Sequence, residues 1–233
     1  MINHEREFIP TTPYNKIIDY QEVFGISKQQ RDNGKTIVLT TGVYDIFHYK
    51  HAESLAFISS LGNFTIVGIP GDLEIKIAAN NGIQNKDIDG PIIDYDKRAK
   101  TIAHLPYVDL IFKKTTDKFN LVTNIKPNIL VQSITSGEEV ISEILRMSAK
   151  LNHQIVNKNL VLNIDGVNCT ILFIDDITDG IADIVAADIV IEKTKTWQNE
   201  KYNKDKFHGS LIKERIIKRE INHRYNLNNL TNN

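Results

Sequence analysis

The chain has 233 residues, of which 41 % are hydrophobic and 24 % charged, values typical of a globular protein and not of a disordered, collagenous or coiled-coil chain. Its 28 basic and 29 acidic residues leave a net charge of -1, which argues against a protein that binds nucleic acid through bulk charge. One cysteine allows no intrachain disulfide, and no apolar run reaches the roughly 18 residues that span a bilayer. We therefore expect a cytoplasmic protein with no nucleic-acid partner and no membrane partner.

Strands and helices are predicted to alternate along the first two thirds of the chain. Residues 1–33 are expected to form an arm, 1–15, and a lead-in helix, 16–32. Beyond them, β-branched runs alternate with segments whose apolar residues recur at helical spacing. The predicted strands are 36–40, 64–69, 108–112 and 128–131, and the predicted helices are 51–60, 95–104, 121–125 and 138–151. This order predicts an α/β fold, a Rossmann-like doubly wound parallel sheet with helices on both faces.

The remainder of the chain has a different texture. Two apolar runs, 159–164 and 169–174, flank Asp165-Gly166 and predict a β-hairpin. The later predicted elements are a short helix at 181–187, a strand at 189–191, a mobile loop at 193–207 and a closing helix at 210–224. We therefore expect one main domain over 34–225, in which 151–207 is an elaboration with an inserted β-hairpin region. A frayed tail over 226–233 is expected to follow it.

One segment between the first predicted strand and the next helix carries the chemistry. Ligands of a parallel sheet bind beyond the carboxyl ends of its strands, which here places them at the loops after Thr40, Ile69 and Val131. Gly42 allows a tight turn, and the free N–H groups of a helix start favour an anion such as phosphate. His48 and His51 are three residues apart, so both are expected on one face at that helix start.

A zinc site and a pair of unrelated surface histidines both fit this segment less well. A zinc site needs a third protein ligand, and none is apparent nearby in the sequence. Two unrelated surface histidines would not require the strand and the glycine turn that precede them. The order of strand, Gly42, Asp45 and both histidines therefore favours phosphate binding, with imidazole groups that stabilise the charge of a phosphoryl transfer.

The spacing Gly42-x-Tyr44-Asp45-x-x-His48-x-x-His51 resembles the G-x-F-D-x-x-H-x-G-H signature of the nucleotidylyltransferase superfamily. The similarity extends over residues 16–109 to the adenylyltransferase domain of bifunctional heptose-phosphate kinase/adenylyltransferases, and glycerol-3-phosphate cytidylyltransferases share the same frame. The resemblance implies an enzyme that transfers AMP or CMP from a nucleoside triphosphate to a phosphorylated sugar or polyol and releases pyrophosphate. ATP and CTP remain open alternatives.

The resemblance also implies roles for individual residues. His48 and His51 are the implied catalytic residues. The implied nucleotide-binding residues are Thr41, Gly42, Val43, Tyr44, Asp45, Lys50, Arg98 and Ser210. Ser210 belongs to a shortened form of the family's second signature, over 208–216, and is the expected cap of the last helix. Mg²⁺ is the implied cofactor, bridging the phosphates with no protein ligand of its own, and family members are often homodimers.

Two positions depart from the family pattern. Lys50 replaces the glycine between the histidines, and Gly90 replaces the arginine that usually precedes Pro91. Lys76 and Lys86 are candidates for a lysine that is usual before that segment. These departures support an alternative hypothesis, a nucleotide-binding or scaffold protein that has kept the fold and lost catalysis.

Overall fold

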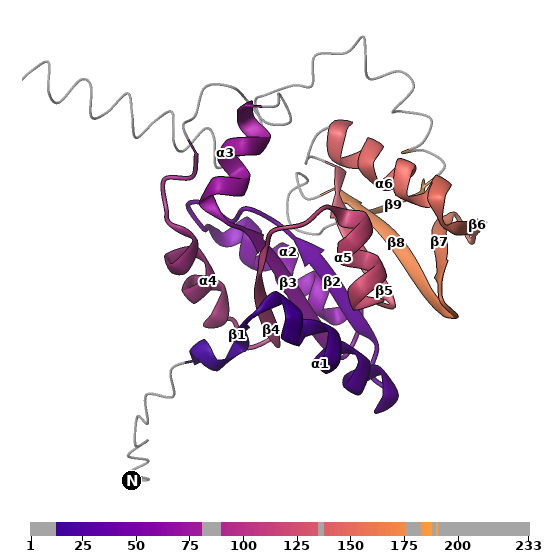
Figure 1. Ribbon diagram of the computed structural model, residues 1–233, viewed down its shortest axis with the longest axis horizontal. Coiled ribbons are helices and arrows are strands. Elements are labelled where there is room, and N and C mark those ends of the chain that lie inside the picture. Colours follow the sequence, from indigo (N-terminus) through magenta and orange to yellow (C-terminus); the bar gives the residue numbers. More distant parts are fainter. Residues whose placement is uncertain (1–12, 81–89, 135–137, 176–182, 188–189, 191–233) are drawn as a thin grey trace, which may run out of the picture.

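The computed structural model describes residues 13–80, 90–134, 138–175, 183–187 and 190 (Figure 1). Within these residues the helices are η1 (Pro13–Lys16, 3-10), α1 (Tyr20–Asp32), α2 (Tyr49–Ser60), α3 (Asp72–Asn80), α4 (Tyr95–Ala103), α5 (Lys118–Ile125) and α6 (Glu138–Lys150). The strands are β1 (Ile17–Ile18), β2 (Ile37–Thr41), β3 (Phe64–Pro70), β4 (Leu110–Lys114), β5 (Ile129–Ser133), β6 (Asn152–Val156), β7 (Asn159–Ile164), β8 (Val167–Asp175) and β9 (Asp183–Val185).

All of these strands belong to one mixed sheet. Its order is β1-β4-β3-β2-β5-β8-β7-β6, and β9 pairs with the end of β8. The pairs from β1 to β8 along this order are parallel, whereas β8 with β7, β7 with β6 and β8 with β9 are antiparallel. The central strands β2 and β3 are buried along nearly their whole length, as expected for strands covered on both faces. The predicted Rossmann-like α/β fold is confirmed.

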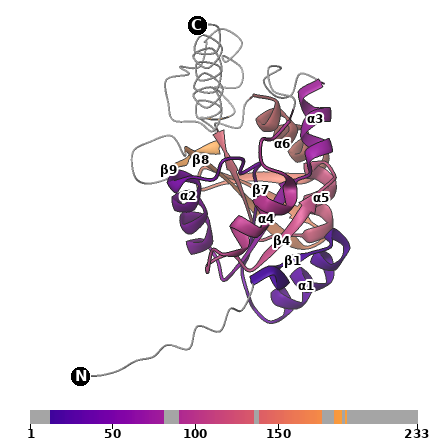
Figure 2. The same cartoon turned by 90° about the vertical axis from the view of Figure 1, so that its left-hand side faces the viewer.

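Two layers of helices sandwich the sheet (Figure 2). On one face, α1, α5 and α6 pack on the largest core cluster, which takes alternate residues from all the central strands. On the other face, α2 and α4 pack on two smaller clusters. The alternation along β2 shows the division, because Ile37 and Leu39 face the first layer and Val38 faces the second. Helices α2 and α5 therefore begin on opposite faces of the same sheet edge.

The predicted hairpin is confirmed, and it is continuous with the main sheet. Asp165 and Gly166 have φ values of 49° and 85°, so both lie in the left-handed region that a two-residue type I′ turn needs. Strand β8 leaves this turn and pairs in parallel with β5 over 129–133. The described strands of 151–207 therefore extend the sheet and its core.

Three predicted elements differ from the structure. The lead-in helix begins at Tyr20, because Ile17–Ile18 pair with β4 as a short edge strand. The predicted helix at 181–187 is wrong over Asp183–Val185, which is β9 and pairs with β8. The predicted strand at 189–191 is wrong at its described residue, Val190, whose N–H donates to the carbonyl of Ala186 in a helical pattern.

Two elements were not predicted from the sequence. Helix α3 follows β3 directly, and β6 precedes β7 through a two-residue turn at Asn157-Lys158. Both turn residues have positive φ, 49° and 65°, a conformation that asparagine tolerates better than most residues. Asn157 was therefore the residue in the sequence that could have indicated a second hairpin turn.

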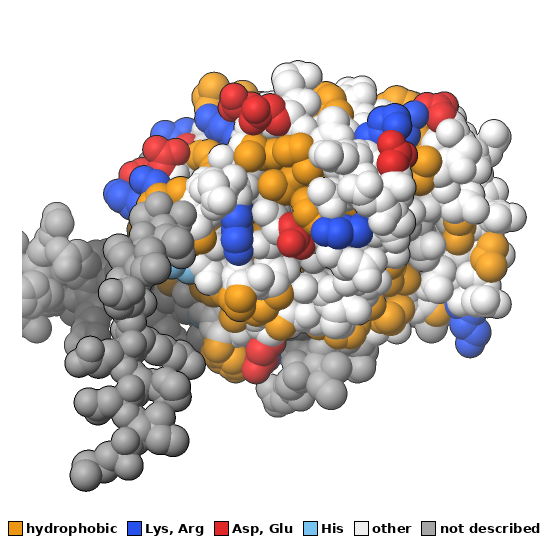
Figure 3. All heavy atoms as spheres, turned by 90° about the horizontal axis from the view of Figure 1, so that it is seen from below, with side chains coloured by type: hydrophobic (Ala, Val, Ile, Leu, Met, Phe, Trp, Pro, Cys, Tyr) orange, Lys and Arg blue, Asp and Glu red, His pale blue; other side chains and the backbone are white. Residues whose placement is uncertain are grey.

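The closing helix at 210–224, the loop at 193–207 and the tail at 226–233 lie outside the described residues. In the described part of the chain, none of the helices is long and apolar enough to cross a membrane. Basic and acidic side chains are interspersed on the face drawn in Figure 3, with hydrophobic side chains between them. The described part of that face has no broad patch of one sign.

Candidate functional site

The candidate site lies at the carboxyl ends of the parallel strands, where β2 ends at Thr41. The loop that follows turns at Gly42, whose N–H donates to the carbonyl of Gly68 on the neighbouring strand at 3.2 Å. A Cβ at Gly42 would lie 2.7 Å from the Tyr44 ring, so only glycine fits beneath that ring. Tyr44 and Ile46 adopt positive φ values of 52° and 48°, which cost energy for a bulky or β-branched residue. Such strain in a loop is a pointer to function.

The two histidines lie together at the start of α2. His48 is the N-cap residue in an extended conformation, and its carbonyl accepts hydrogen bonds from the N–H groups of His51 and Ala52. The two imidazole rings stack with their centroids 4.0 Å apart and an interplanar angle of 22°. The rings of Tyr44 and Phe47 contact His51 from other sides, at centroid distances of 5.6 and 5.5 Å. The predicted juxtaposition of His48 and His51 is therefore present in the structure.

His51 is electrically neutral at physiological pH. Burial, aided by the neighbouring His48, lowers the pKa of His51 from 6.5 to about 4, while the Asp45 carboxylate opposes both effects. The Nδ1 atom of His51 is buried and has no hydrogen-bond partner among the described residues. A neutral imidazole carries one N–H donor and one acceptor nitrogen, so this ring can donate one hydrogen bond to a ligand oxygen.

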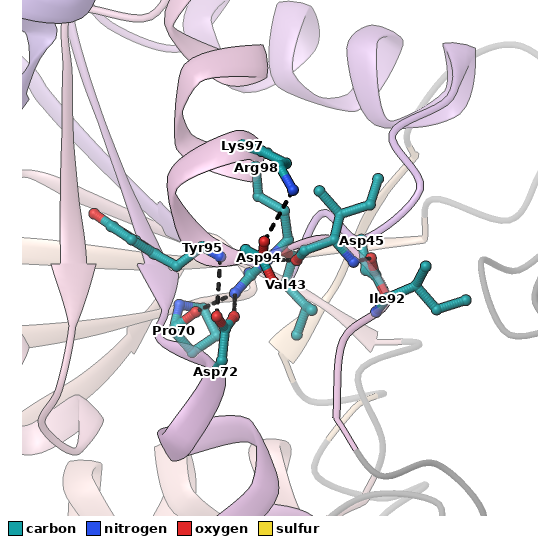
Figure 4. Close-up of polar contacts among 10 residues, drawn as sticks. Val43, Asp45, Pro70, Asp72, Ile92, Asp94, Tyr95, Lys97 and Arg98 are labelled. Atoms are coloured by element: carbon teal, nitrogen blue, oxygen red, sulfur yellow. Dashed lines mark hydrogen bonds and ion pairs between the residues drawn. The ribbon is translucent and has the colours of Figure 1, made fainter.

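Asp45 ties the loop to the segment before α4. Its carboxylate is buried and accepts hydrogen bonds from the backbone N–H groups of Ile92 and Ile93, both at 2.9 Å (Figure 4). Each backbone donor takes one of the two carboxylate oxygens. Asp45 therefore holds residues 92–93 against the loop 42–48, which we call the signature loop.

Arg98 on α4 connects three segments of the site (Figure 4). The residue is 1 % exposed, and its guanidinium donates to the carbonyls of Val43 at 2.6 Å, Pro70 at 2.9 Å and Ile93 at 2.8 Å. A fourth hydrogen bond, of 2.7 Å, forms an ion pair with Asp72 at the start of α3. Four of the five guanidinium N–H groups are thus engaged by the protein itself. The structure places Arg98 beneath the signature loop as a buried clasp between the ends of β2 and β3, rather than in a surface salt bridge.

Asp72, which was not identified from the sequence, completes this clasp. Burial raises the pKa of its carboxyl, but the hydrogen bonds from Arg98 and from the Tyr95 N–H outweigh that effect and lower the pKa overall. Its sequence signals were its position shortly after the second central strand and the pair Gly71-Asp72, which fits the family resemblance over 16–109.

The remaining predicted residues are distributed around the loop. Thr41 ends β2, and its hydroxyl accepts a hydrogen bond from Lys118 Nζ at 3.3 Å. Val43 contributes its carbonyl to Arg98, and Lys50 is half-buried in the first turn of α2. Ser210 lies outside the described residues, so the structure does not place it near the others. No sequence signal pointed to Lys118, because only the packing of α5 brings it to Thr41.

The departure at Gly90 follows from the backbone conformation. Gly90 has a φ of +118°, which side-chain-bearing residues rarely adopt. A Cβ there would lie 3.0 Å from Cε of Lys76, whose aliphatic stem runs beside this position. An arginine at position 90 would therefore require a different backbone and a displaced Lys76. Lys86 lies outside the described residues.

The described residues contain no group of three or more His, Cys, Asp or Glu side chains that could hold a metal ion. The histidine pair and Asp45 are close, but both Asp45 oxygens already accept backbone hydrogen bonds. The described side chains thus fit a metal that reaches the site on a ligand better than one held in a protein cage.

A model of the family described as cytidylyltransferase-like matches residues 39–215, which is more than half of the chain and includes the whole signature loop. The chain belongs to the cytidylyltransferase-like family. This membership assigns it to the nucleotidyltransferases and agrees with the resemblance drawn from Gly42, His48 and His51.

The curated relatives of this cytidylyltransferase-like chain include several proteins with one name. It is 34 % identical over 145 residues to the bifunctional protein HldE of Nitratiruptor sp., an alignment that covers 61 % of this chain and 29 % of that protein. It is 30 % identical over 154 residues to the protein of the same name from Campylobacter fetus, covering 61 % of this chain and 31 % of the relative. The chain therefore spans less than a third of the length of these two relatives.

Among solved structures, the chain is similar to the lipopolysaccharide core biosynthesis protein from Thermoplasma volcanium. The match has 29 % sequence identity and a TM-score of 0.39, and it covers 49 % of this chain and 90 % of that one.

Proposed function

We propose that this chain transfers a nucleotidyl group, AMP or CMP, from a nucleoside triphosphate to the phosphate of a sugar or polyol and releases pyrophosphate. The observation that carries the proposal is the stacked pair of His48 and His51 at the start of α2, directly beyond the carboxyl end of β2. The chain belongs to a family of nucleotidyltransferases, and helix N–H groups together with imidazole donors at this position suit the binding of a triphosphate.

The reaction needs no nucleophile from the protein. A phosphate oxygen of the acceptor attacks the α-phosphorus and forms the new P–O bond, while the bond from that phosphorus to the bridging oxygen of the β-phosphate breaks. The bridging oxygen leaves with pyrophosphate, so negative charge grows on the leaving group. Hydrogen bonds from His48 and from neutral His51 stabilise this charge without reorganisation, because Tyr44 and Phe47 hold the His51 ring in place.

The site residues divide between binding the nucleotide and shaping the loop that binds it. Gly42 lets the backbone approach the triphosphate, and Thr41, Val43 and Tyr44 form the turn around it. Asp45 and Arg98 hold this turn in its strained form through bonds to 92–93 and to the ends of β2 and β3. Lys50, beside the histidines, adds a positive charge near the phosphates, and Ser210 is expected to cap a helix that binds them.

Mg²⁺ is the cofactor that this chemistry favours. Since the described side chains form no cage of three ligands, phosphate oxygens and water would supply most of its coordination, as is usual for this ion. When bound, the ion neutralises phosphate charge and orients the triphosphate.

Release of pyrophosphate in the presence of Mg²⁺ tests this function. The full chain is incubated with ATP or CTP and a panel of sugar and polyol phosphates, and pyrophosphate is measured enzymatically. His48→Ala and His51→Ala should each lower the rate by about 100-fold or more, as does loss of one charge-stabilising donor in other enzymes. His153→Ala, on the exposed strand β6, is the matched control and should leave the rate unchanged.

The outcomes separate the proposal from its alternative. Tight binding of a nucleoside triphosphate without pyrophosphate release across the panel would identify a nucleotide-binding protein that has lost catalysis. Full activity in both histidine variants would contradict the proposed role of the pair. Sedimentation of the full chain tests the predicted homodimer separately.

A further inference from the structure

A buried lysine lies at the same sheet edge as the histidines, on the opposite face. Lys118 is the first residue of α5 and is only 4 % exposed. Its Nζ atom lies 3.3 Å from Oγ1 of Thr41, the residue that immediately precedes Gly42. Because α5 and α2 pack on opposite faces, the ammonium approaches the end of β2 from the side away from the histidines.

Among the residues that the structure describes, the ammonium has few partners. It carries three N–H donors, and the hydroxyl of Thr41 is its one hydrogen-bond acceptor among the described residues. No carboxylate of the described residues forms an ion pair with it. The charge of Glu143 on α6 acts on the ammonium from a distance. The hydrogen bond that Glu143 accepts from Lys118, at 2.8 Å, comes from the backbone N–H and not from the ammonium. Lys114 at the end of β4 adds a second positive charge to the same region.

The immediate surroundings give the ammonium no structural role. Asp117 caps α5 with its own carboxylate, which accepts the N–H of Asn120, so the helix start does not depend on the Lys118 side chain. The neighbouring strand residue is Gly68, where a Cβ would lie 3.1 Å from Thr41 Cγ2. A buried charge with one long hydrogen bond disfavours folding, and an apolar residue of similar size would usually be neutral or stabilising in its place.

We propose that the Lys118 ammonium, with the Thr41 hydroxyl beside it, binds a phosphate group of a substrate at the carboxyl edge of the sheet. This inference rests on the proposed function, which brings two phosphate sources to that edge, the nucleoside triphosphate and the acceptor. Two N–H donors that have no acceptor among the described residues, together with the second charge of Lys114, match the several acceptor oxygens of a phosphate dianion.

The ionisation of Lys118 agrees with this role. Burial, aided by the charge of Lys114, lowers its pKa to about 8, while Glu143 opposes both effects. The group is therefore mostly charged at neutral pH, and an anion bound beside it would favour the charged form.

The test compares binding and stability in Lys118→Met and Lys118→Gln, with Lys28→Met as the matched control. Lys28 is exposed on α1 and pairs with Asp32. Calorimetric titration of the full chain uses three probes, MgATP, MgCTP and inorganic phosphate, and urea unfolding reports stability. Both Lys118 variants should unfold at the wild-type urea concentration or above it. Their affinity for at least one probe should fall about 10- to 100-fold, the usual effect of losing a charge-assisted hydrogen bond.

Each outcome has a distinct meaning. A loss for the nucleotides assigns Lys118 to the triphosphate, and a loss for inorganic phosphate alone assigns it to the acceptor. Unchanged affinity for all three probes overturns the inference, as does a marked loss of stability in both variants, which would show a structural role. If the wild type releases pyrophosphate and the Lys118 variants match it in binding, this inference fails while the proposed function stands. If the wild type binds no nucleotide, the proposed function itself fails.

Discussion

Burial of His51 should make the protein less stable as the pH falls below neutrality. Burial, with His48 stacked on the ring, lowers the pKa of His51 to about 4 in the folded protein, against about 6.5 in the unfolded chain. A base with a lowered pKa takes up its proton more readily when the chain unfolds. Its stabilising effect is therefore complete above pH 6.5 and is lost as the pH falls toward 4.

These two pKa values set the size of the effect. Between pH 7.5 and pH 5.0 they correspond to a loss of about 2 kcal/mol in the free energy of unfolding. The imidazole is not completely buried, and screening by solvent lowers the expected loss to about 1–2 kcal/mol. Other groups titrate in the same range. The contribution of His51 is therefore the loss of unfolding free energy between the two pH values in the wild type minus the same loss in His51→Gln.

Urea unfolding at both pH values, followed by circular dichroism, measures this difference. Wild type should lose about 1–2 kcal/mol more than His51→Gln on going from pH 7.5 to 5.0. His153→Gln, on the exposed strand β6, should lose as much as wild type. Equal losses in wild type and His51→Gln would refute a buried neutral His51 and the packing of Tyr44, Phe47 and His48 around it.

Two further predictions concern the loop and its clasp. Arg98→Met should lower the free energy of unfolding by about 3–5 kcal/mol, because Asp72 and three carbonyls lose their hydrogen-bond donor. Its control, Lys97→Met on the exposed side of α4, should change the free energy of unfolding by less than about 0.5 kcal/mol. Urea unfolding checks both, and equal stability of the two variants would contradict the clasp. Gly42→Ala should displace the Tyr44 ring and lower nucleotide affinity at least about tenfold in titration calorimetry, since the added Cβ meets that ring at 2.7 Å. Gly25→Ala, in the exposed middle of α1 with no atom within 4 Å, is its control and should stabilise the protein by about 0.5–1 kcal/mol without altering affinity.

Local sequence signals determined the central part of the fold and the centre of the candidate site. The β-branched runs of β2, β3 and β5 are strong enough to define buried strands without any knowledge of their neighbours. Asp165-Gly166 specifies its turn through residues that accept positive φ. The spacing of His48 and His51 after Gly42 likewise predicts their proximity, because two residues three positions apart at the start of a helix lie on the same face.

The tertiary structure decided the elements and groups that depend on distant partners. Strands β1 and β9 are short and β6 is exposed along its length, so their hydrogen bonds to β4, β8 and β7 define them more than their own composition does. The clasp of Arg98 joins Val43, Pro70 and Asp72, which are 26 to 55 residues away along the chain. In the sequence, Lys118 lies before the helix predicted over 121–125 and looks like any charged residue of a connecting segment. Its ammonium is buried beside Thr41 only because α5 packs on the sheet and α6 packs on α5. Desolvation depends on what surrounds a side chain in space and not on its neighbours in sequence.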